Sequence, residues 1–108
     1  MFKIEGNSIL ITRGDTGIFS LTVRDSNGAV YDYSDDAVRL TVRRNVYAKE
    51  PVLQKTIVYG ESVAITSSDT ASLPYGEYVY DVELKTPSGM VCTIIPPSRF
   101  VIMVEVTY

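Results

Sequence analysis

Residues 67–84, with the sequence SSDTASLPYGEYVYDVEL, constrain the fold more than any other segment of this chain. The second half of the segment alternates between apolar and polar side chains, and a period of two is typical of a half-buried β-strand. Its apolar positions are Tyr78, Tyr80, Val82 and Leu84. Before this strand, Ser67 or the preceding Thr66 can cap a helix, and Pro74 ends it. We therefore expect a helical turn near residues 67–73 that leads into a strand with two inward-facing tyrosines.

Short predicted strands, separated by turn signals, fill most of the remaining chain. The predicted strands are residues 8–12, 18–24, 29–33, 38–44, 52–59, 61–66, 90–95 and 99–107. The outward-facing residues of the 38–44 strand are Arg39, Thr41 and Arg43. Asn27 and Gly28 favour a tight hairpin because they tolerate positive φ, and residues 87–89 favour a second hairpin. Since turns recur at intervals of roughly 8–12 residues, we predict an all-β sandwich of about seven to nine antiparallel strands.

Length and composition exclude several classes of protein. With 108 residues the chain can bury one core, so we expect a single domain over residues 1–108. Its net charge of −3 and its scattered basic residues argue against binding to nucleic acid. No apolar run approaches the roughly 20 residues of a membrane span, and the N-terminal segment does not resemble a secretory signal. The single cysteine, Cys92, excludes an intrachain disulfide and fits a protein made in a reducing cytosol.

The residues usually found in active sites are scarce. Histidine is absent, which removes the usual general base and the usual zinc ligand. We expect Cys92 to be a small buried thiol within an apolar strand. The aspartates Asp32, Asp35 and Asp36 do not have the spacing of a calcium-binding loop, so we interpret them as a solvated turn. The sequence therefore predicts no catalytic residue, no cofactor and no metal site.

Two overlapping tripeptides leave alternatives open. Asp15, Thr16 and Gly17 match the nucleophile motif of aspartic proteases, and the dimeric retropepsin-like enzymes use one such aspartate from each subunit. Arg13, Gly14 and Asp15 spell the tripeptide that integrins recognise, which would suit a surface adhesion domain. A tight turn between two strands is the interpretation that we favour for both, because the flanking residues of a protease site are missing.

Several of these elements occur together in one known family. They are the RGDT turn at residues 13–16, the Asn27–Gly28 hairpin, the block at residues 69–81, and a closing strand that ends at residues 105–107. In this combination the chain resembles the immunoglobulin-like N-terminal modules of upper-baseplate and related tail proteins, found in phages and prophages of Gram-positive bacteria. The resemblance covers nearly the whole chain, and its motifs are turns and core positions.

The resemblance carries expectations for both fold and role. It implies an immunoglobulin-like β-sandwich and a structural, non-enzymatic, protein-binding component of a virion, in the tail, the baseplate or the head decoration. The protein would be made in the cytoplasm of the host bacterium, and its partner would be itself or another tail or baseplate protein. Such modules usually continue into a stalk or a receptor-binding region. Because this sequence stops at Tyr108, we expect a small stand-alone virion protein or a prophage remnant.

The last predicted strand suggests where a partner binds. Alternation turns Phe100, Ile102, Val104 and Val106 toward the core and leaves the residues between them outward. If residues 90–95 pair with residues 78–85, further outward apolar side chains join the same sheet, and a contiguous apolar patch marks a protein interface. The predicted interface residues are Val79, Val91, Thr93, Ile95, Val101 and Met103. We expect this face to mediate self-association or docking to another virion protein.

Overall fold

The computed structural model describes residues 1–104, which form eight strands and one short helix. The strands are β1 (Phe2–Glu5), β2 (Ser8–Thr12), β3 (Gly17–Phe19), β4 (Ala37–Arg43), β5 (Pro51–Ile57), β6 (Val63–Ile65), β7 (Gly76–Lys85) and β8 (Val91–Met103). The helix α1 (Ser67–Thr70) lies between β6 and β7. Six strands form one sheet in the order β1-β2-β8-β7-β4-β5, while β3 and β6 form a second sheet.

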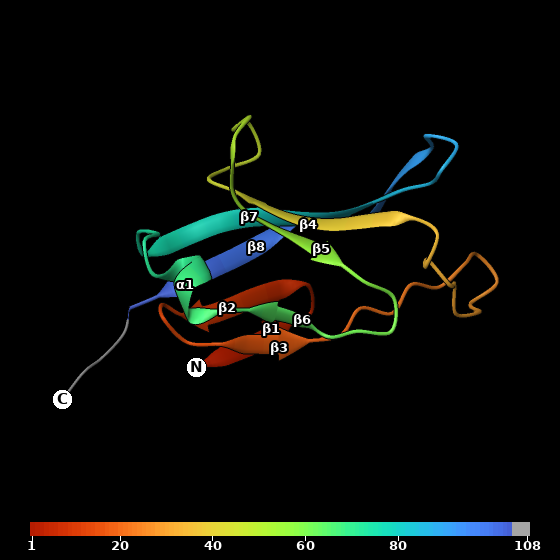
Figure 1. The fold of residues 1–108 in the computed structure, drawn as a ribbon. Coiled ribbons are helices and arrows are strands. Elements are labelled where there is room, and N and C mark those ends of the chain that lie inside the picture. Colours follow the sequence, from red (N-terminus) through yellow and green to blue (C-terminus); the bar gives the residue numbers. More distant parts are fainter. Residues whose placement is uncertain (105–108) are drawn as a thin grey trace.

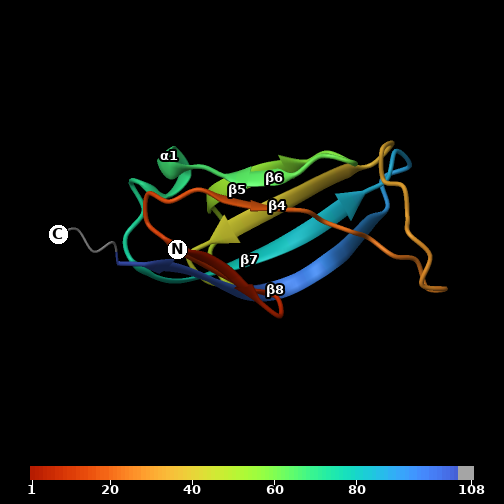
Figure 2. The same ribbon diagram turned by 90° about the horizontal axis from the view of Figure 1, so that it is seen from below.

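The two sheets pack as the layers of a sandwich. Figure 1 shows β4, β5 and β7 above β3 and β6, with the β1–β2 hairpin curling round to the lower layer. Seen from below, β4, β7 and β8 run side by side (Figure 2). The fully buried apolar side chains of the core are Ile9, Ile11, Val38, Leu40, Val42, Ile65, Val82, Phe100 and Ile102. The predicted all-β sandwich is confirmed.

One strand pair differs from the predicted antiparallel arrangement. β2 lies parallel to β8, with Ile9 opposite Phe100 and Thr12 opposite Met103. A hairpin forces its two strands to be antiparallel, but β2 and β8 come from opposite ends of the domain and are free of that constraint. The result is a mixed sheet in which an N-terminal and a C-terminal strand are hydrogen-bonded neighbours.

The corner at the start of β7 agrees with the sequence prediction. Tyr78 and Tyr80 point into the core and are only 2% and 4% exposed. The Tyr78 hydroxyl donates to the carbonyl of Pro74 at 2.7 Å, and the Tyr80 hydroxyl donates to the carbonyl of Asn7 at 2.6 Å. These bonds satisfy the polar ends of two large buried rings. The helix is shorter than predicted: it ends at Thr70 and not at Leu73. Leu73 packs against the core beyond the end of the helix.

The region between β3 and β4 contains less strand than predicted. β3 ends at Phe19, and residues 20–33 are joined into a loose hairpin by a single bridge between Arg24 and Val30. The expected turn at Asn27 and Gly28 does form, because the Asp25 carboxylate accepts hydrogen bonds from the backbone of Asn27 and Ala29 at 2.9 and 3.0 Å. Val23 and Tyr33 nevertheless remain buried, so this loop is anchored to the core at both ends.

The last strand also differs from its prediction. β8 runs without a break from Val91 through Pro96 and Pro97 to Met103, whereas we expected two strands. Its register against β7 shifts on both sides of Val82, and such bulges tolerate prolines, which lack a backbone donor. The predicted core position of Val104 is wrong: this side chain is 59% exposed, beyond the end of the strand. Val106 lies outside the described residues.

Candidate protein-binding face

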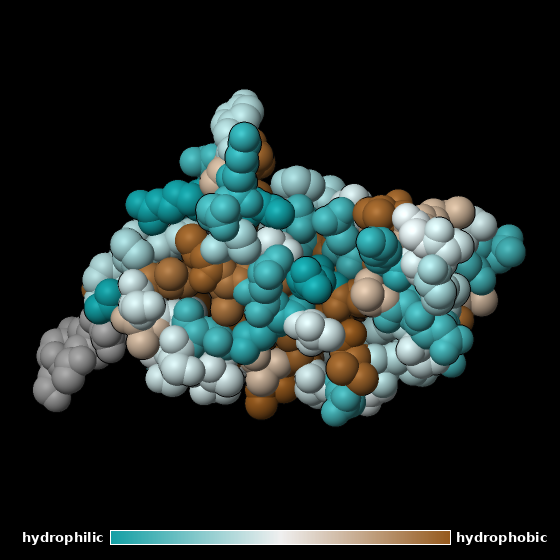
Figure 3. All heavy atoms as spheres, turned by 45° about the horizontal axis from the view of Figure 1, so that its top comes forward, coloured by the Kyte–Doolittle hydropathy of each residue, from teal (hydrophilic) through white to brown (hydrophobic). Residues whose placement is uncertain are grey.

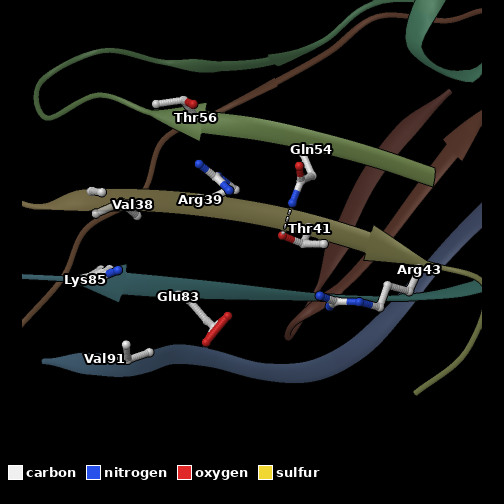
Figure 4. Close-up of a pocket in the computed structure, with 10 residues that line it drawn as sticks. Val38, Arg39, Thr41, Arg43, Gln54, Thr56, Glu83, Lys85 and Val91 are labelled. Carbon is white, nitrogen blue, oxygen red and sulfur yellow. Dashed lines mark hydrogen bonds between the residues drawn. The ribbon is translucent and has the colours of Figure 1, made fainter. Parts of the chain in front are cut away.

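The outer face of the six-stranded sheet carries a broad groove. The groove has a volume of about 400 Å³ and lies over β4, β5 and β7, next to the start of β8 (Figure 4). Its lining residues are Ala37, Val38, Arg39, Thr41, Arg43, Gln54, Thr56, Glu83, Lys85 and Val91. Most of these side chains are polar or charged, so the groove suits a polar ligand or a partner surface better than an apolar molecule.

Thr41 forms the centre of the groove floor. It is only 6% exposed although it lies on the outer face of β4, because the longer side chains around it shield it. Its Oγ1 accepts a hydrogen bond from Nε2 of Gln54 on the adjacent strand at 3.4 Å (Figure 4). The two residues are directly opposite each other in the β4–β5 ladder. The floor is therefore built on regular strand pairing, which gives it a fixed shape.

The groove carries more positive than negative charge. Its lining contains Arg39, Arg43 and Lys85 but only one carboxylate, that of Glu83. Arg43 is partly engaged, since its Nη1 lies 3.6 Å from the carboxylate of Asp81 on β7. Among residues 1–104, neither Arg39 nor Lys85 makes a side-chain hydrogen bond or an ion pair. Two cations are thus available to a ligand or partner that offers carboxylates.

The predicted interface residues fall into two separate groups on this sheet. Val91 and Thr93 lie opposite Lys85 and Glu83 at one end of the β7–β8 pair. Half-buried apolar residues lie at the other end, where Val101 is next to Leu10 of β2. The residues of this second group are Val79, Val101 and Met103. Figure 3, which brings the upper layer of Figure 1 forward, shows separate apolar areas among hydrophilic side chains rather than one continuous patch.

Ile95 does not belong to the outer face. It lies opposite the buried Val82 and packs against the core. Between Thr93 and Ile95 the register against β7 shifts by one residue, and such a shift turns the following side chains to the opposite face of the sheet. The prediction that Ile95 contributes to the interface is therefore wrong.

The tripeptide at residues 13–15 packs onto the corner between α1 and β7. The guanidinium of Arg13 lies over the ring of Tyr75, 4.1 Å from its centroid, and Nη1 reaches the carbonyl of Leu73 at 3.5 Å. The backbone N–H of Gly14 donates to Oγ1 of the fully buried Thr70 at 3.0 Å. The carboxylate of Asp15 contacts the amino group of Met1. The segment is a tight turn whose side chains contact other parts of the same chain.

Cys92 lies opposite the buried Leu84, on the side of the sheet that faces the core, yet it is exposed. The inner face is covered at Leu84 on β7, but β2 pairs with β8 only at residues 100–103, so Cys92 lies where β8 is the edge strand of the sheet. The prediction of a buried thiol is therefore wrong. Alternation gave the correct face, but the position of a strand within the sheet decides whether that face is covered.

Residues 1–104 contain neither a metal-binding cluster nor a membrane-spanning helix. No group of three or more histidine, cysteine, aspartate or glutamate side chains is arranged to hold a metal ion there. No helix in that part of the chain has the length and apolar character of a membrane span. Comparisons of the chain with protein-family models, curated proteins and solved structures find no match.

Proposed function

We propose that this protein is a structural, protein-binding component of a phage or prophage virion, in the tail, the baseplate or the head decoration. It acts without catalysis and binds a second copy or another tail or baseplate protein through the outer face of its six-stranded sheet. The observation that carries the proposal is the groove over β4, β5 and β7, where Arg39 and Lys85 have no partner among the described residues. The resemblance of the turns and core positions to phage tail modules supplies the virion context.

The architecture of the sheet supports this face as the binding surface. Its inner side packs against the core and is unavailable, whereas its outer side offers a rigid surface of paired strands. That surface combines a charged groove with half-buried aliphatic residues such as Val79 and Val101. Protein interfaces commonly combine apolar and polar areas.

The contacts of residues 13–15 favour this proposal over the two alternatives. A retropepsin-like site requires the Asp15 carboxylate to share a proton with its counterpart in a second subunit, but here it contacts the Met1 amino group. Integrin recognition requires an accessible Arg13, whose guanidinium here lies over Tyr75. We expect Asp15→Asn to fold normally and the wild type to cleave no peptide at acid pH. Pepstatin-sensitive cleavage that this substitution abolishes would establish the protease instead.

Charge insertion into the outer face tests the proposed binding surface. We expect the wild type to self-associate at micromolar concentration, or to bind a tail or baseplate protein. The double variant Val79→Lys/Met103→Lys should lose this binding while its unfolding midpoint stays close to that of the wild type. Ile18→Lys is the matched control, because Ile18 is an exposed apolar residue on the opposite sheet. Light scattering and co-purification with virions measure the two forms of binding. A double variant that binds as well as the wild type would contradict the proposal.

A further inference from the structure

The unpartnered cations of the groove lie toward one end of the sheet. Lys85 is opposite Ala37 in the β4–β7 ladder, and Arg39 is opposite Glu83 on the next outward-facing pair. A guanidinium and an ammonium at neighbouring positions favour one or two carboxylates, since charge-assisted hydrogen bonds are stronger than neutral ones. Glu83 is the one carboxylate among the lining residues, so the groove remains positive overall. Its negative charge limits the number of further carboxylates that the groove attracts.

An acidic turn adjoins this end of the groove. It consists of residues 32–36, with the sequence DYSDD, and it leads directly into β4. Ser34 and Asp36 line a second hollow that shares Ala37, Val38 and Thr56 with the groove. The carboxylates of the turn and the cations of the groove therefore belong to one continuous surface, although no ion pair joins them within residues 1–104.

The acidic turn is held in one conformation. The ring of Tyr33 is buried and meets the ring of Tyr59 edge to face at a centroid distance of 5.1 Å. Asp32 accepts a hydrogen bond from the backbone of Ser34 at 2.9 Å, and Asp36 accepts one from the Tyr31 hydroxyl at 2.5 Å. Asp35 is exposed and makes no side-chain hydrogen bond or ion pair in the described part of the chain. A rigid turn with a free carboxylate loses little conformational entropy on binding.

A surface that places a positive region beside a negative one is complementary to itself after a two-fold rotation. Resting on the proposed function, we infer that the partner is a second copy of this chain, and that the acidic turn of each copy enters the groove of the other. In this arrangement the carboxylate of Asp35 meets Arg39 and Lys85 of the second copy. Two such contacts form about one axis, so a closed dimer results and not an open filament.

A charge-swap experiment tests this pairing. Arg39→Glu places a carboxylate opposite Asp35 of the second copy, and Asp35→Lys places an ammonium opposite Arg39. Each variant alone should dissociate at least about tenfold more readily than the wild type, because the pair between positions 35 and 39 becomes a pair of like charges at both contacts of its homodimer. An equimolar mixture should recover a heterodimer close to wild-type affinity, since both of its contacts join opposite charges. The dissociation constants follow from analytical ultracentrifugation, which should also show weaker wild-type association at higher salt.

Two exposed charges on other loops provide matched controls. Lys49→Glu and Glu61→Lys change the net charge by the same amounts as the test variants and should leave the dimer unchanged. Circular dichroism and urea unfolding check that every variant folds, which we expect because Arg39 and Asp35 are exposed.

The results of these experiments distinguish a failure of the self-pairing from a failure of the proposed virion function. A wild type that stays monomeric when concentrated overturns the self-pairing, while its presence or absence in purified virions decides the broader proposal. Dimers that survive both substitutions, or single-variant losses that the mixture does not restore, also overturn the pairing of turn and groove. The pairing is supported when each single variant loses association and the equimolar mixture recovers it.

Discussion

The ring of Phe2 lies directly against the backbone of Gly17, so that a Cβ built on Gly17 would be 2.2 Å from Cδ1 of that ring. The same ring stacks on Phe19, with centroids 6.3 Å apart and an interplanar angle of 19°. Phe2 belongs to β1 in the large sheet, whereas Gly17 and Phe19 belong to β3 in the small one. This contact therefore closes one side of the sandwich between strands that share no hydrogen-bond ladder.

The close approach predicts that Gly17→Ala destabilises the protein by roughly 1–3 kcal/mol, because the added methyl must push the Phe2 ring aside. Phe2→Ala alone should also cost stability through lost packing. In the double variant the alanine at position 17 has room, so the two effects should not add. Urea unfolding of the four proteins measures the coupling. Strict additivity would show that the ring and the glycine do not contact each other in solution.

The corner tyrosines give a second prediction. Tyr78→Phe removes the hydroxyl that donates to Pro74 and accepts from Nη1 of Arg44, and should cost about 1 kcal/mol. Tyr78→Ala or Tyr80→Ala removes a buried ring and should cost roughly 3–5 kcal/mol. Thermal and urea unfolding measure these losses. An unchanged midpoint for both alanine variants would contradict the assignment of this corner.

The exposed position of Cys92 gives a third prediction. The apolar sequence around Cys92 suggests a buried, unreactive thiol, whereas the structure predicts a reactive one. In native buffer one thiol per chain should react with a maleimide at a rate close to that of an unstructured cysteine peptide. Cys92→Ser should change the free energy of unfolding by less than about 0.5 kcal/mol, as is usual for surface positions. Labelling that requires denaturant would instead show that the tip of the β7–β8 hairpin is covered.

Local sequence patterns predicted best the strands that have one buried face and one solvent-exposed face. β2 matches its predicted bounds, and β4 is within one residue of its own, because each is a short run rich in apolar residues with one face buried. Residues 29–33 were predicted as the return strand of a hairpin, but Arg24 and Val30 form their only bridge, so the neighbour that would make them a strand is missing. Whether such a neighbour exists depends on the whole topology and is not encoded in the segment itself.

The candidate site was predictable only in part. Alternation placed Arg39, Thr41 and Arg43 on the outer face, where the structure has them. The groove appears only when β5 and β7 flank β4, and that order depends on contacts between distant segments. Ile95 was assigned to the wrong face because a bulge interrupts the period of two, and no local signal gave its position.

The ion pair between Lys55 and Asp69 gives the last prediction, a dependence of stability on pH. Nζ of Lys55 lies 2.5 Å from the Asp69 carboxylate, and the two side chains are 23% and 16% exposed. Asp69 also accepts a hydrogen bond from the backbone N–H of Thr66 at 2.7 Å. Burial raises the pKa of this carboxyl, but the hydrogen bonds from Lys55 and Thr66 outweigh it and hold the pKa below its ordinary value.

Because the folded-state pKa of Asp69 is the lower one, the carboxylate contributes its full stabilisation above the unfolded pKa of about 3.9. That contribution is lost as the pH falls through the folded-state pKa. Asp69→Asn should therefore cost roughly 1.5–3 kcal/mol near neutral pH, the range for hydrogen bonds to charged groups, and progressively less in acid. Urea unfolding at a series of pH values from about 7 to about 2.5 measures the difference, with Glu61→Gln as an exposed control. A difference that stays constant across this range would mean that the charge of Asp69 does not stabilise the fold, and that the substitution acts through packing alone.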